Sequence, residues 1–327
     1  NQFLGDVMKT VYPDGVEYDR SIIESGEFEI PEDFTFFNGP VDQRELYRRI
    51  RDAQAVLLGC TKIDPDTLER CTELRTIVFL GIGAGSYVGL DQASRLGIAV
   101  SNTPHYGDNT VAEHALALLL AAARHVIPLD REIRNGMWNR EREGIELRGK
   151  TFGLIGLGGV GAAMAQIANG LGMKVLCWTR APSQDRAAKH GVIFSKLSEL
   201  LSCADFVSIH LPLTPETTGL IGEKEFSLMK KEAIFVNTAR AEVVDTQSLA
   251  RALRENRLRA AGVDVFDDEP PDSNHPLFEC ENVVLTPHIG FNAPEANINI
   301  LRIGFNNVVE FISGNPVNVL NMKALEH

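Results

Sequence analysis

Residues 154–180 read LIGLGGVGAAMAQIANGLGMKVLCWTR, a glycine-rich turn between two apolar runs. Gly156, Gly158 and Gly161 form the pattern G-x-G-x-x-G directly after an apolar strand and at the start of a helical segment. The first glycine permits the tight turn, the second lets the backbone approach a pyrophosphate, and the third allows close packing of helix on strand. Because the helix N-terminus adds N–H groups and partial positive charge, we expect a dinucleotide site here.

The second strand of this unit ends without the acidic residue that usually accepts hydrogen bonds from the adenosine ribose of NAD. The residues where it would fall, Leu176 to Arg180, contain no Asp or Glu. Thr179 and Arg180 end the strand instead, and a guanidinium pairs well with a 2′-phosphate. The alternative is that Arg180 is a solvated loop arginine. The sequence leaves the cofactor open between NADP and NAD, with a slight preference for NADP.

Short β-rich runs alternate with helix-length segments from residue 150 onward, which is typical of βαβ units and a parallel sheet. We expect helices over 160–171, 197–201, 223–229 and 246–255. Residues before 104 repeat the rhythm more weakly, in AVLLG, RTIVFLG and IAVSN. The expected fold class is α/β, with a Rossmann-type doubly wound parallel sheet and a second, smaller α/β domain. The strands expected in the larger sheet are FGLIG, KVLCW, DFVSIHL, AIFVNTA, AAGVDVF and VVLTPH.

Two long helical patterns, over 110–136 and 294–314, stand at the joints between these halves. The simplest layout returns the second helix to the first domain, which is then discontinuous. We expect a substrate-binding domain of residues 1–103 and 292–327 and a dinucleotide-binding domain of residues 104–291.

Composition excludes several classes of partner. The formal charge of −12 and the pI near 5.2 repel polyanions, so we expect no nucleic-acid partner. Glu113, His114 and Arg124 interrupt the longest apolar stretch, residues 111–129, before it reaches the length of a membrane span. The five cysteines form no C-x-x-C pair, which favours a cytoplasmic protein with no metal site or disulfide frame, and we expect no secretory signal.

Polar residues of complementary types follow three of the expected strands. Arg240 lies in NTARAEVVD, Asp264 and Glu269 lie in DVFDDEPP, and His288 lies in TPHIG. Reduction of a keto acid by hydride needs a cation for the carboxylate or carbonyl oxygen and a proton donor for the forming alkoxide, tasks that suit Arg240 and His288. Glu269, if it meets the imidazole, would orient it and raise its pKa. Singly, each residue also suits an ordinary structural role, and their coincidence at strand ends favours a site.

The stretches GLIGLGGVG, HLPLTPETTGLIG, FVNTARAEVVD, AAGVDVFDDEPP and NVVLTPHIGF occur in this order and spacing. Together they closely resemble the D-isomer-specific 2-hydroxyacid dehydrogenase family, which includes phosphoglycerate dehydrogenases and glyoxylate/hydroxypyruvate reductases. The resemblance runs from about residue 54 to residue 319 and is most specific from 150 to 290. It implies an NAD(P)-dependent oxidoreductase acting on a small 2-keto or 2-hydroxy acid such as glyoxylate, hydroxypyruvate or 3-phosphoglycerate. It also implies a flavodoxin-like substrate domain and a homodimer.

The resemblance also assigns residues. Arg240, Glu269 and His288 match the catalytic arginine, glutamate and histidine, and the N–H groups near Gly83 and Ala84 would receive the substrate carboxylate, with Arg240 as a second substrate contact. The cofactor-binding positions it implies, together with the glycine turn and the strand end described above, are Thr110, Gly156, Gly158, Gly159, Val160, Gly161, Thr179, Arg180, Pro212, Thr217, Thr238, Ala239, Asp264 and Gly290.

Two departures from the family pattern and two alternatives remain. Ser86 stands where members commonly carry an aspartate, and the loop around it offers no cation for a phosphorylated substrate, although arginines at 44, 48, 49 and 51 could supply one. The second departure is the missing ribose-binding acid. Glu269 argues against the related formate dehydrogenases, which are expected to carry glutamine there. The other alternative is a dinucleotide-sensing protein similar to the C-terminal-binding corepressors, against which the compactness of the chain argues.

Overall fold

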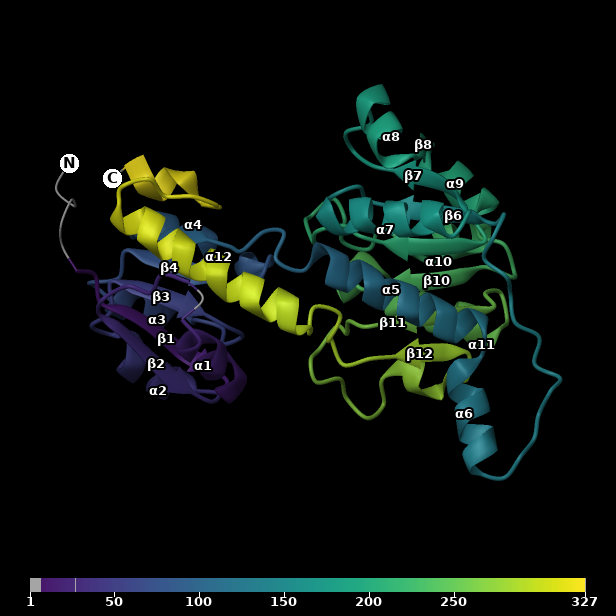
Figure 1. Cartoon of the computed structure of the whole chain (residues 1–327), viewed down its shortest axis with the longest axis horizontal. Coiled ribbons are helices and arrows are strands. Elements are labelled where there is room, and N and C mark those ends of the chain that lie inside the picture. The colour runs from purple at the N-terminus through teal and green to yellow at the C-terminus, as the bar shows by residue number, and fades with distance from the viewer. Residues whose placement is uncertain (1–6, 27, 327) are drawn as a thin grey trace. The chain divides into compact units, whose positions relative to one another are not determined.

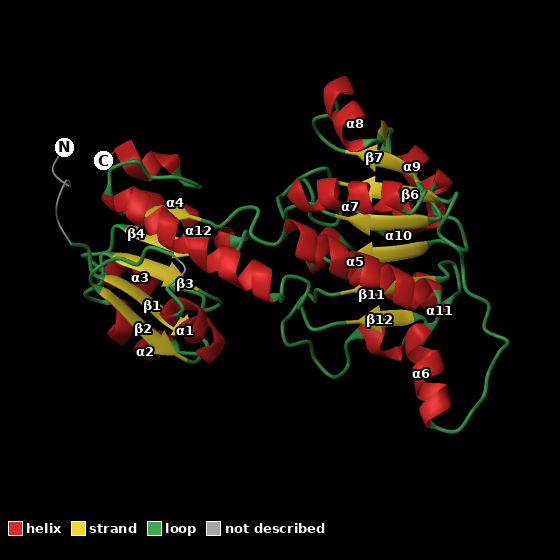
Figure 2. Cartoon of the chain, viewed as in Figure 1, coloured by secondary structure: helices red, strands yellow, loops and turns green. Residues whose placement is uncertain are grey.

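The computed structural model describes residues 7–26 and 28–326. The chain divides into two compact units: unit 1 comprises residues 1–107 and 293–327, and unit 2 comprises residues 108–292. Residues 1–6, 27 and 327, which belong to the expected substrate domain, lie outside the described residues. Each unit is an α/β domain in which helices cover a β-sheet (Figure 2).

The sheet of unit 2 is parallel, in the order β12-β11-β10-β9-β6-β7-β8. All six strands expected from the sequence are confirmed. The two-residue edge strand β8 was missed, because a run that short carries no periodicity and half of it faces solvent. The strands are β6 (Thr151–Ile155), β7 (Lys174–Trp178), β8 (Ile193–Phe194), β9 (Phe206–Ile209), β10 (Ile234–Asn237), β11 (Ala260–Val263) and β12 (Val283–Leu285).

Helices cover both faces of this sheet, as a doubly wound fold requires. On one face α5 (Asp108–Ala123) and α7 (Gly159–Gly170) pack against each other and bury alanine and leucine side chains. On the other face lie α9 (Leu197–Cys203), α10 (Glu223–Leu228) and α11 (Thr246–Arg254). The helix α8 (Gln184–His190) follows β7, and 3₁₀ turns span Ala241–Val243 and Pro276–Glu279.

The long helix expected over residues 110–136 is wrong as a single element. The structure breaks it into α5 and α6 (Val126–Arg134), which meet at 60°. His125, between them, has a left-handed φ of 53°. Pro128 explains the break, because its ring would collide with the carbonyl of Arg124 in a continuous helix and it has no N–H to donate. Among the described residues no single helix is long and apolar enough to cross a membrane, and only the bent α5–α6 pair passes that test, by length and composition alone.

The sheet of unit 1 has the order β2-β1-β3-β4-β5, the flavodoxin-like arrangement. Its three later strands match the weak runs in the sequence, but β1 and β2 were missed. Pro13, Asp14 and Gly15 at the end of β1 are turn residues by composition, and the ladder does shift register between Tyr12 and Gly15. The strands are β1 (Thr10–Gly15), β2 (Phe34–Asn38), β3 (Ala55–Leu58), β4 (Thr76–Phe79) and β5 (Ala99–Ser101).

The long C-terminal helix α12 (Pro294–Ile312) packs on the sheet of unit 1, as the sequence led us to expect (Figure 1). Phe305 is fully buried there against Phe34 and Phe28. The remaining elements are α1 (Glu17–Glu24), α2 (Gln43–Ile50), α3 (Pro65–Arg70), α4 (Leu90–Arg95) and the 3₁₀ turns Ala84–Ser86 and Met322–Glu326.

Candidate active site

The glycine turn joins β6 to α7 beside the point where the strand order reverses, between β6 and β9. Gly156 has a φ of 102°, and a Cβ on it would lie 2.2 Å from the carbonyl oxygen of His210. A Cβ on Gly161 would lie 2.2 Å from the carbonyl oxygen of Gly156. These two glycines are therefore fixed by turn geometry and by close packing, which accounts for two of the three glycines of the motif.

The middle glycine has a different environment. Gly158 precedes the first residue of α7, and no heavy atom lies within 4 Å of the Cβ position it leaves empty. The backbone at Gly158 is thus open to a ligand at the N-terminus of a helix of 12 residues, which begins at Gly159 and Val160. A helix N-terminus beside the strand-order reversal of an open α/β sheet fits a pyrophosphate.

The end of β7 carries Thr179, which is half-buried, and Arg180, which is exposed. Arg186 of α8, which the sequence reasoning missed, donates from Nη2 to the carbonyl of Leu157 at 2.6 Å and so ties this loop to the glycine turn. Glu216 lies near Arg180: the pKa of Glu216 is lowered by a hydrogen bond from Thr214, then by its own N–H, with the Arg180 charge contributing. The Arg180 guanidinium therefore already interacts with one carboxylate of the protein, that of Glu216.

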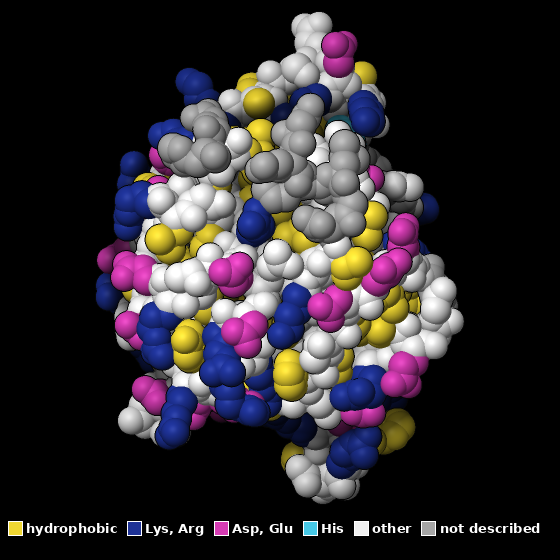
Figure 3. All heavy atoms as spheres, turned by 90° about the vertical axis from the view of Figure 1, so that its left-hand side faces the viewer, with side chains coloured by type: hydrophobic (Ala, Val, Ile, Leu, Met, Phe, Trp, Pro, Cys, Tyr) yellow, Lys and Arg dark blue, Asp and Glu magenta, His cyan; other side chains and the backbone are white. Residues whose placement is uncertain are grey.

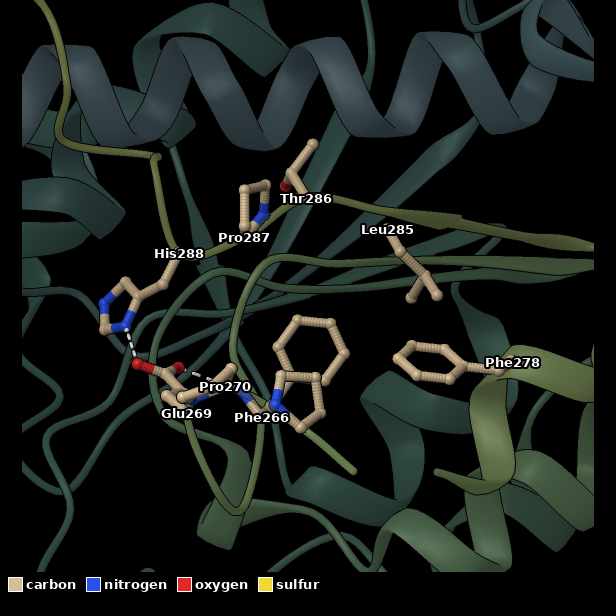
Figure 4. A pocket seen from close by; sticks show the side chains of 9 residues that line it. Phe266, Glu269, Pro270, Phe278, Leu285, Thr286, Pro287 and His288 are labelled. Carbon is tan, nitrogen blue, oxygen red and sulfur yellow. Dashed lines mark hydrogen bonds and ion pairs between the residues drawn. The ribbon is translucent and has the colours of Figure 1, made fainter. Parts of the chain in front are cut away.

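His288 and Glu269 meet. The imidazole Nδ1 lies 2.7 Å from Oε2 of Glu269, and both side chains are about one third exposed. The other carboxylate oxygen, Oε1, accepts the N–H of Phe266 at 3.1 Å, which fixes the carboxylate (Figure 4). The pair leaves Nε2 of His288 as the ring nitrogen available for a substrate.

A buried carboxylate holds the turn that carries His288, whose φ is 52°. Asp264, 1% exposed, accepts from the N–H of Ile289 at 3.0 Å and of Gly290 at 2.8 Å, and its carbonyl accepts the N–H of His288 at 2.7 Å. Burial alone would raise the pKa of Asp264, but hydrogen bonds from His114, Thr286 and these two N–H groups together lower it. Asp264 thus stays ionised and keeps His288 in a left-handed conformation that is strained for this residue.

Thr286 and His114 complete this network, and the sequence reasoning assigned neither of them. Thr286 Oγ1 donates its proton to Asp264 Oδ1 at 2.6 Å. Because a hydroxyl has one proton, His114 Nε2, 2.9 Å from the same Oγ1 and 3.3 Å from Asp264 Oδ1, must be the donor to both. His114 belongs to α5, so the network ties that helix to the His288 turn.

Arg240 follows β10 and is half-buried. The buried side chain of Asn237 clamps its turn: Nδ2 donates to the carbonyl of Arg240 at 2.9 Å and Oδ1 accepts the N–H of Ala239 at 3.0 Å. Asn237, another residue the sequence reasoning missed, is thus the anchor of this loop. Beside it, the hydroxyl of Thr238 is buried with no hydrogen-bond partner among the described residues, which is an observation that fits a bound cofactor at this strand end.

An apolar hollow of about 440 Å³ borders the His288–Glu269 pair. Figure 4 shows the two polar side chains at one end and the aromatic rings of Phe266 and Phe278 towards the other. Such a flank lowers the local dielectric and strengthens the hydrogen bond between imidazole and carboxylate. The remaining lining residues are Pro270, Pro271, Leu285, Thr286 and Pro287.

The other positions expected at the cofactor lie on unit 2 as well. Thr110 is in the first turn of α5, half-buried. Thr217 is buried, and its Oγ1 donates to the carbonyl of Pro212 at 2.7 Å and accepts the N–H of Thr214 at 2.8 Å, so it shapes the 212–217 loop from within. Gly290 leaves no room for a side chain, because a Cβ there would lie 2.9 Å from Asp264 Oδ2.

Gly83 and Ala84 lie on unit 1, in the loop that follows β4. Gly81 opens this loop, and its N–H donates to Thr103 Oγ1 at 2.9 Å. For the N–H groups of Gly83 and Ala84 we find no acceptor within residues 7–26 and 28–326. Two adjacent N–H groups without acceptors suit an anion such as a carboxylate.

The comparisons with known proteins agree with this geometry. The family model described as "D-isomer specific 2-hydroxyacid dehydrogenase, NAD binding domain" matches residues 116–290, more than half of the chain. The glyoxylate reductase of Aeropyrum pernix is 39% identical over 297 residues, which cover 88% of this chain and 88% of that protein. The D-3-phosphoglycerate dehydrogenase of Archaeoglobus fulgidus is 38% identical over 88% of this chain, but the match spans only 55% of that longer protein.

Solved structures of dehydrogenases and reductases have the same fold as this chain. The D-lactate dehydrogenase of Aquifex aeolicus, in complex with NAD and lactic acid, is 26% identical with a TM-score of 0.83, covering 95% of this chain and 99% of that one. An acyclic imino acid reductase in complex with NADPH and D-Arg is 28% identical with a TM-score of 0.83, covering 96% of this chain and 100% of that one.

These relatives are enzymes, so the comparisons lend no support to the corepressor-like alternative. They are named as dehydrogenases and reductases, and the matching family model is that of a nicotinamide-dinucleotide-binding domain. The chain belongs to the D-isomer-specific 2-hydroxyacid dehydrogenase family, and it is an oxidoreductase that acts on CH–OH groups with a nicotinamide dinucleotide.

Proposed function

We propose that this dehydrogenase reduces a short, unphosphorylated 2-keto acid, of the glyoxylate or hydroxypyruvate type, with Arg240, Glu269 and His288 as its catalytic residues. The observation that carries the proposal is the 2.7 Å contact of His288 Nδ1 with Glu269 Oε2, at the same sheet edge as Arg240. A histidine fixed by a carboxylate on one nitrogen presents the other as a directed proton donor.

Each residue has a separate task in this proposal. The guanidinium of Arg240 binds the substrate carboxylate and polarises the keto oxygen. The Nε2–H of His288 donates a proton to the alkoxide oxygen as it forms, and Glu269 holds the ring in place. A bound nicotinamide supplies the hydride. On unit 1, the N–H groups of Gly83 and Ala84 are further groups suited to bind a carboxylate.

The cofactor rests, in our proposal, on the backbone of Gly158, Gly159 and Val160 at the N-terminus of α7, with its nicotinamide end near Thr238. The buried, unpaired hydroxyl of Thr238 supports this placement. Ala239, Asp264, Gly290 and Thr110 surround the same end, and Pro212 and Thr217 the adenine end. A preference for NADP over NAD is supported by Thr179 and Arg180 at the end of β7, although Glu216 near Arg180 opposes a second anion there.

The lack of a cation in the loop after β4 supports an unphosphorylated substrate. Arg48 and Arg49, which the sequence offered as phosphate partners, both pair with Glu45, at 2.7 and 2.8 Å. Arg51 pairs with Asp52 at 3.3 Å. Figure 3 likewise shows cationic and anionic side chains interspersed on the face that it presents. A phosphate would have to compete with the Glu45 and Asp52 carboxylates, which already pair with these three arginines.

We also propose a homodimer formed through unit 2, acting in the cytoplasm. The helix α6 and the segment that follows it extend away from the sheet of unit 2 (Figure 1). No α6 side chain is buried, and Ile133, Met137 and Trp138 are exposed, Trp138 by 78%. All five cysteines are free, which favours a reducing compartment. Sedimentation velocity tests the dimer, and a single species of 35.9 kDa would refute it.

A panel assay tests the proposed reaction. The loss of NADPH and NADH absorbance is followed with glyoxylate, hydroxypyruvate, 3-phosphohydroxypyruvate, pyruvate and a branched 2-keto acid. We expect the highest kcat/KM with glyoxylate or hydroxypyruvate. A higher value with the phosphorylated acid would overturn the substrate assignment, and no oxidation with any acid would overturn the reaction.

A further inference from the structure

The carboxylate of Asp108 lies against the first residue of α7. A Cβ built on Gly159 would come 1.8 Å from Oδ2, 2.3 Å from Cγ and 2.5 Å from Oδ1 of Asp108. All three carboxylate atoms therefore crowd the space that a side chain at residue 159 would need. Gly158, one residue earlier, has open space in the same position. A side chain at 159 would have to displace the Asp108 carboxylate, whereas the glycine at 158 leaves room for a ligand.

Two helix N-termini meet at this carboxylate. Asp108 is the first residue of α5 and Gly159 is the first residue of α7, and the two helices, of 16 and 12 residues, pack on each other. Each N-terminus carries unpaired N–H groups and about half a positive charge. An anion is stabilised there, and Asp108 supplies one from the protein itself.

We propose that Asp108 is an affinity-setting residue: its negative charge opposes the pyrophosphate of the dinucleotide at the N-terminus of α7 and weakens the binding of the cofactor. The inference rests on the proposed placement of the pyrophosphate at Gly158, Gly159 and Val160. Any phosphate that approaches these N–H groups is repelled by the Asp108 carboxylate. The same carboxylate also offsets part of the positive potential at the helix N-terminus. The repulsion is a general charge effect, so it acts on NADH and NADPH alike.

This role differs from that of a positioning residue for catalysis. Asp108 lies at the phosphate end of the site, so its removal changes how tightly the dinucleotide binds and leaves the proton-donating pair His288–Glu269 as it is. A tighter complex releases the oxidised cofactor more slowly. Asp108 therefore keeps the dinucleotide exchangeable.

The test uses Asp108→Asn, which keeps the size of the side chain and removes its charge. Dissociation constants of ADP-ribose, NADH and NADPH are measured by isothermal titration calorimetry with the full chain. ADP-ribose has the pyrophosphate but no nicotinamide, so it isolates the phosphate end. We expect all three ligands to bind about five-fold tighter or more, since removal of one charge near a helix N-terminus is worth about 1 kcal/mol. The increase in affinity over the wild type should be smaller in 1 M salt, where charges are screened.

Glu113→Gln is the matched control. It removes the same charge from an exposed position of the same helix, and it should leave the three dissociation constants within two-fold of the wild type. An equal gain in this control would assign the effect to net charge and overturn the inference. Dissociation constants of Asp108→Asn that are unchanged or higher than those of the wild type would also overturn it. The same holds if the variant binds NADH more tightly but not ADP-ribose. If the wild type binds none of the three, the proposed dinucleotide site itself fails.

A second pair of variants tests the geometry without any ligand. Gly159→Ala alone should lower Tm, because its methyl group meets the Asp108 carboxylate. In an Asp108→Ser background, Gly159→Ala should lower Tm much less, since the shorter serine side chain leaves room for the methyl group. Additive effects on Tm would show that Asp108 does not occupy the position beside Gly159.

Discussion

The Nδ1 atom of His288 lies 2.7 Å from Oε2 of Glu269, although the two residues follow different strands, β12 and β11. The contact spans 19 residues of sequence and closes because parallel strands end at one edge of the sheet. Since Oε1 of Glu269 is held by the N–H of Phe266, the carboxylate cannot rotate away without losing that bond. The imidazole is thus fixed on one side and open on the other.

His288→Asn should lower kcat by about 10²- to 10⁴-fold, because a positioned proton donor contributes that much. The dissociation constant of the cofactor should stay near its wild-type value, since the ring acts on the substrate oxygen in the transition state. Steady-state kinetics and a separate binding titration check the two parts. Asp268→Asn, an exposed neighbour of Glu269, is the control and should behave as wild type. An unchanged kcat in the histidine variant would remove His288 from the reaction.

Arg240→Lys should raise KM for the keto acid and lower kcat together. Lysine keeps the charge but lacks the planar fork that matches a carboxylate with two hydrogen bonds. The turn should survive, because Asn237 holds it through the backbone of residues 239 and 240. Saturation curves with glyoxylate measure both constants. Arg251→Lys, at an exposed pair with Glu223, serves as control, and normal saturation in Arg240→Lys would contradict the role.

The sequence predicted the fold of unit 2 and the three catalytic candidates, for different physical reasons. The buried strands are continuous apolar runs bounded by turn residues, so they can be found locally. Arg240, Glu269 and His288 follow such runs, and parallel topology brings strand ends together. The short edge strand β8 and the irregular β1 carry no comparable signal.

The contacts that hold the site could not be found in this way. Asp264 was a candidate from the sequence, but its bonds to Ile289 and Gly290, 25 and 26 residues further along the chain, were not predicted, nor was the contact of His114 with Thr286 across 172 residues. Such partners depend on how α5 packs on the sheet, which no local pattern encodes. Asn237 is the exception, since an Asn at a strand end directly before a turn is a local signal for a backbone clamp.

Asp264→Asn should lower both kcat and stability. An amide cannot accept all the hydrogen bonds that the carboxylate accepts, so the turn of His288 loses its anchor, at a cost of about 1–3 kcal/mol. Because the pKa of Asp264 is lowered in the folded state, its contribution is fully present above the unfolded-state value of about 4 and is lost as the pH falls through the lowered pKa. Urea unfolding at pH 7 and below pH 4 should show the gap between wild type and variant closing. A gap that stays constant with pH would contradict the account.

Arg180→Ala should lower kcat/KM for NADPH by about ten-fold and leave the value for NADH nearly unchanged, because a charge-assisted bond to the 2′-phosphate is worth about 1.5–3 kcal/mol. Glu216→Gln should act in the opposite direction, since it removes the anion that competes for Arg180. Initial rates with both cofactors at fixed keto acid give the ratio. Lys189→Ala, an exposed cation of α8, is the control. Equal losses of kcat/KM with both cofactors would mean that Arg180 acts through a general charge effect and not through the 2′-phosphate.

His210→Gln should remove part of the acid sensitivity of folding. Burial lowers the pKa of His210 to about 4, and its Nε2 lies 2.9 Å from Ser208 Oγ, while its carbonyl forms the wall against Gly156. Above pH 6.5, the usual value in an unfolded chain, the ring is neutral in both states and adds no pH dependence. Between about pH 6.5 and 4 only the unfolded chain takes up the proton, so the folded state loses up to about 3 kcal/mol, and below that range the loss is complete.

Glutamine at this position can still bond to Ser208 but does not titrate in that range. The fall in unfolding free energy from pH 7 to pH 4.5, measured by urea titration, should therefore be smaller in His210→Gln than in the wild type, even if the variant is less stable at pH 7. Equal falls in the two proteins would mean that His210 takes up its proton in the folded state as readily as in the unfolded chain, and the wall of the glycine turn would then have to tolerate a buried cation.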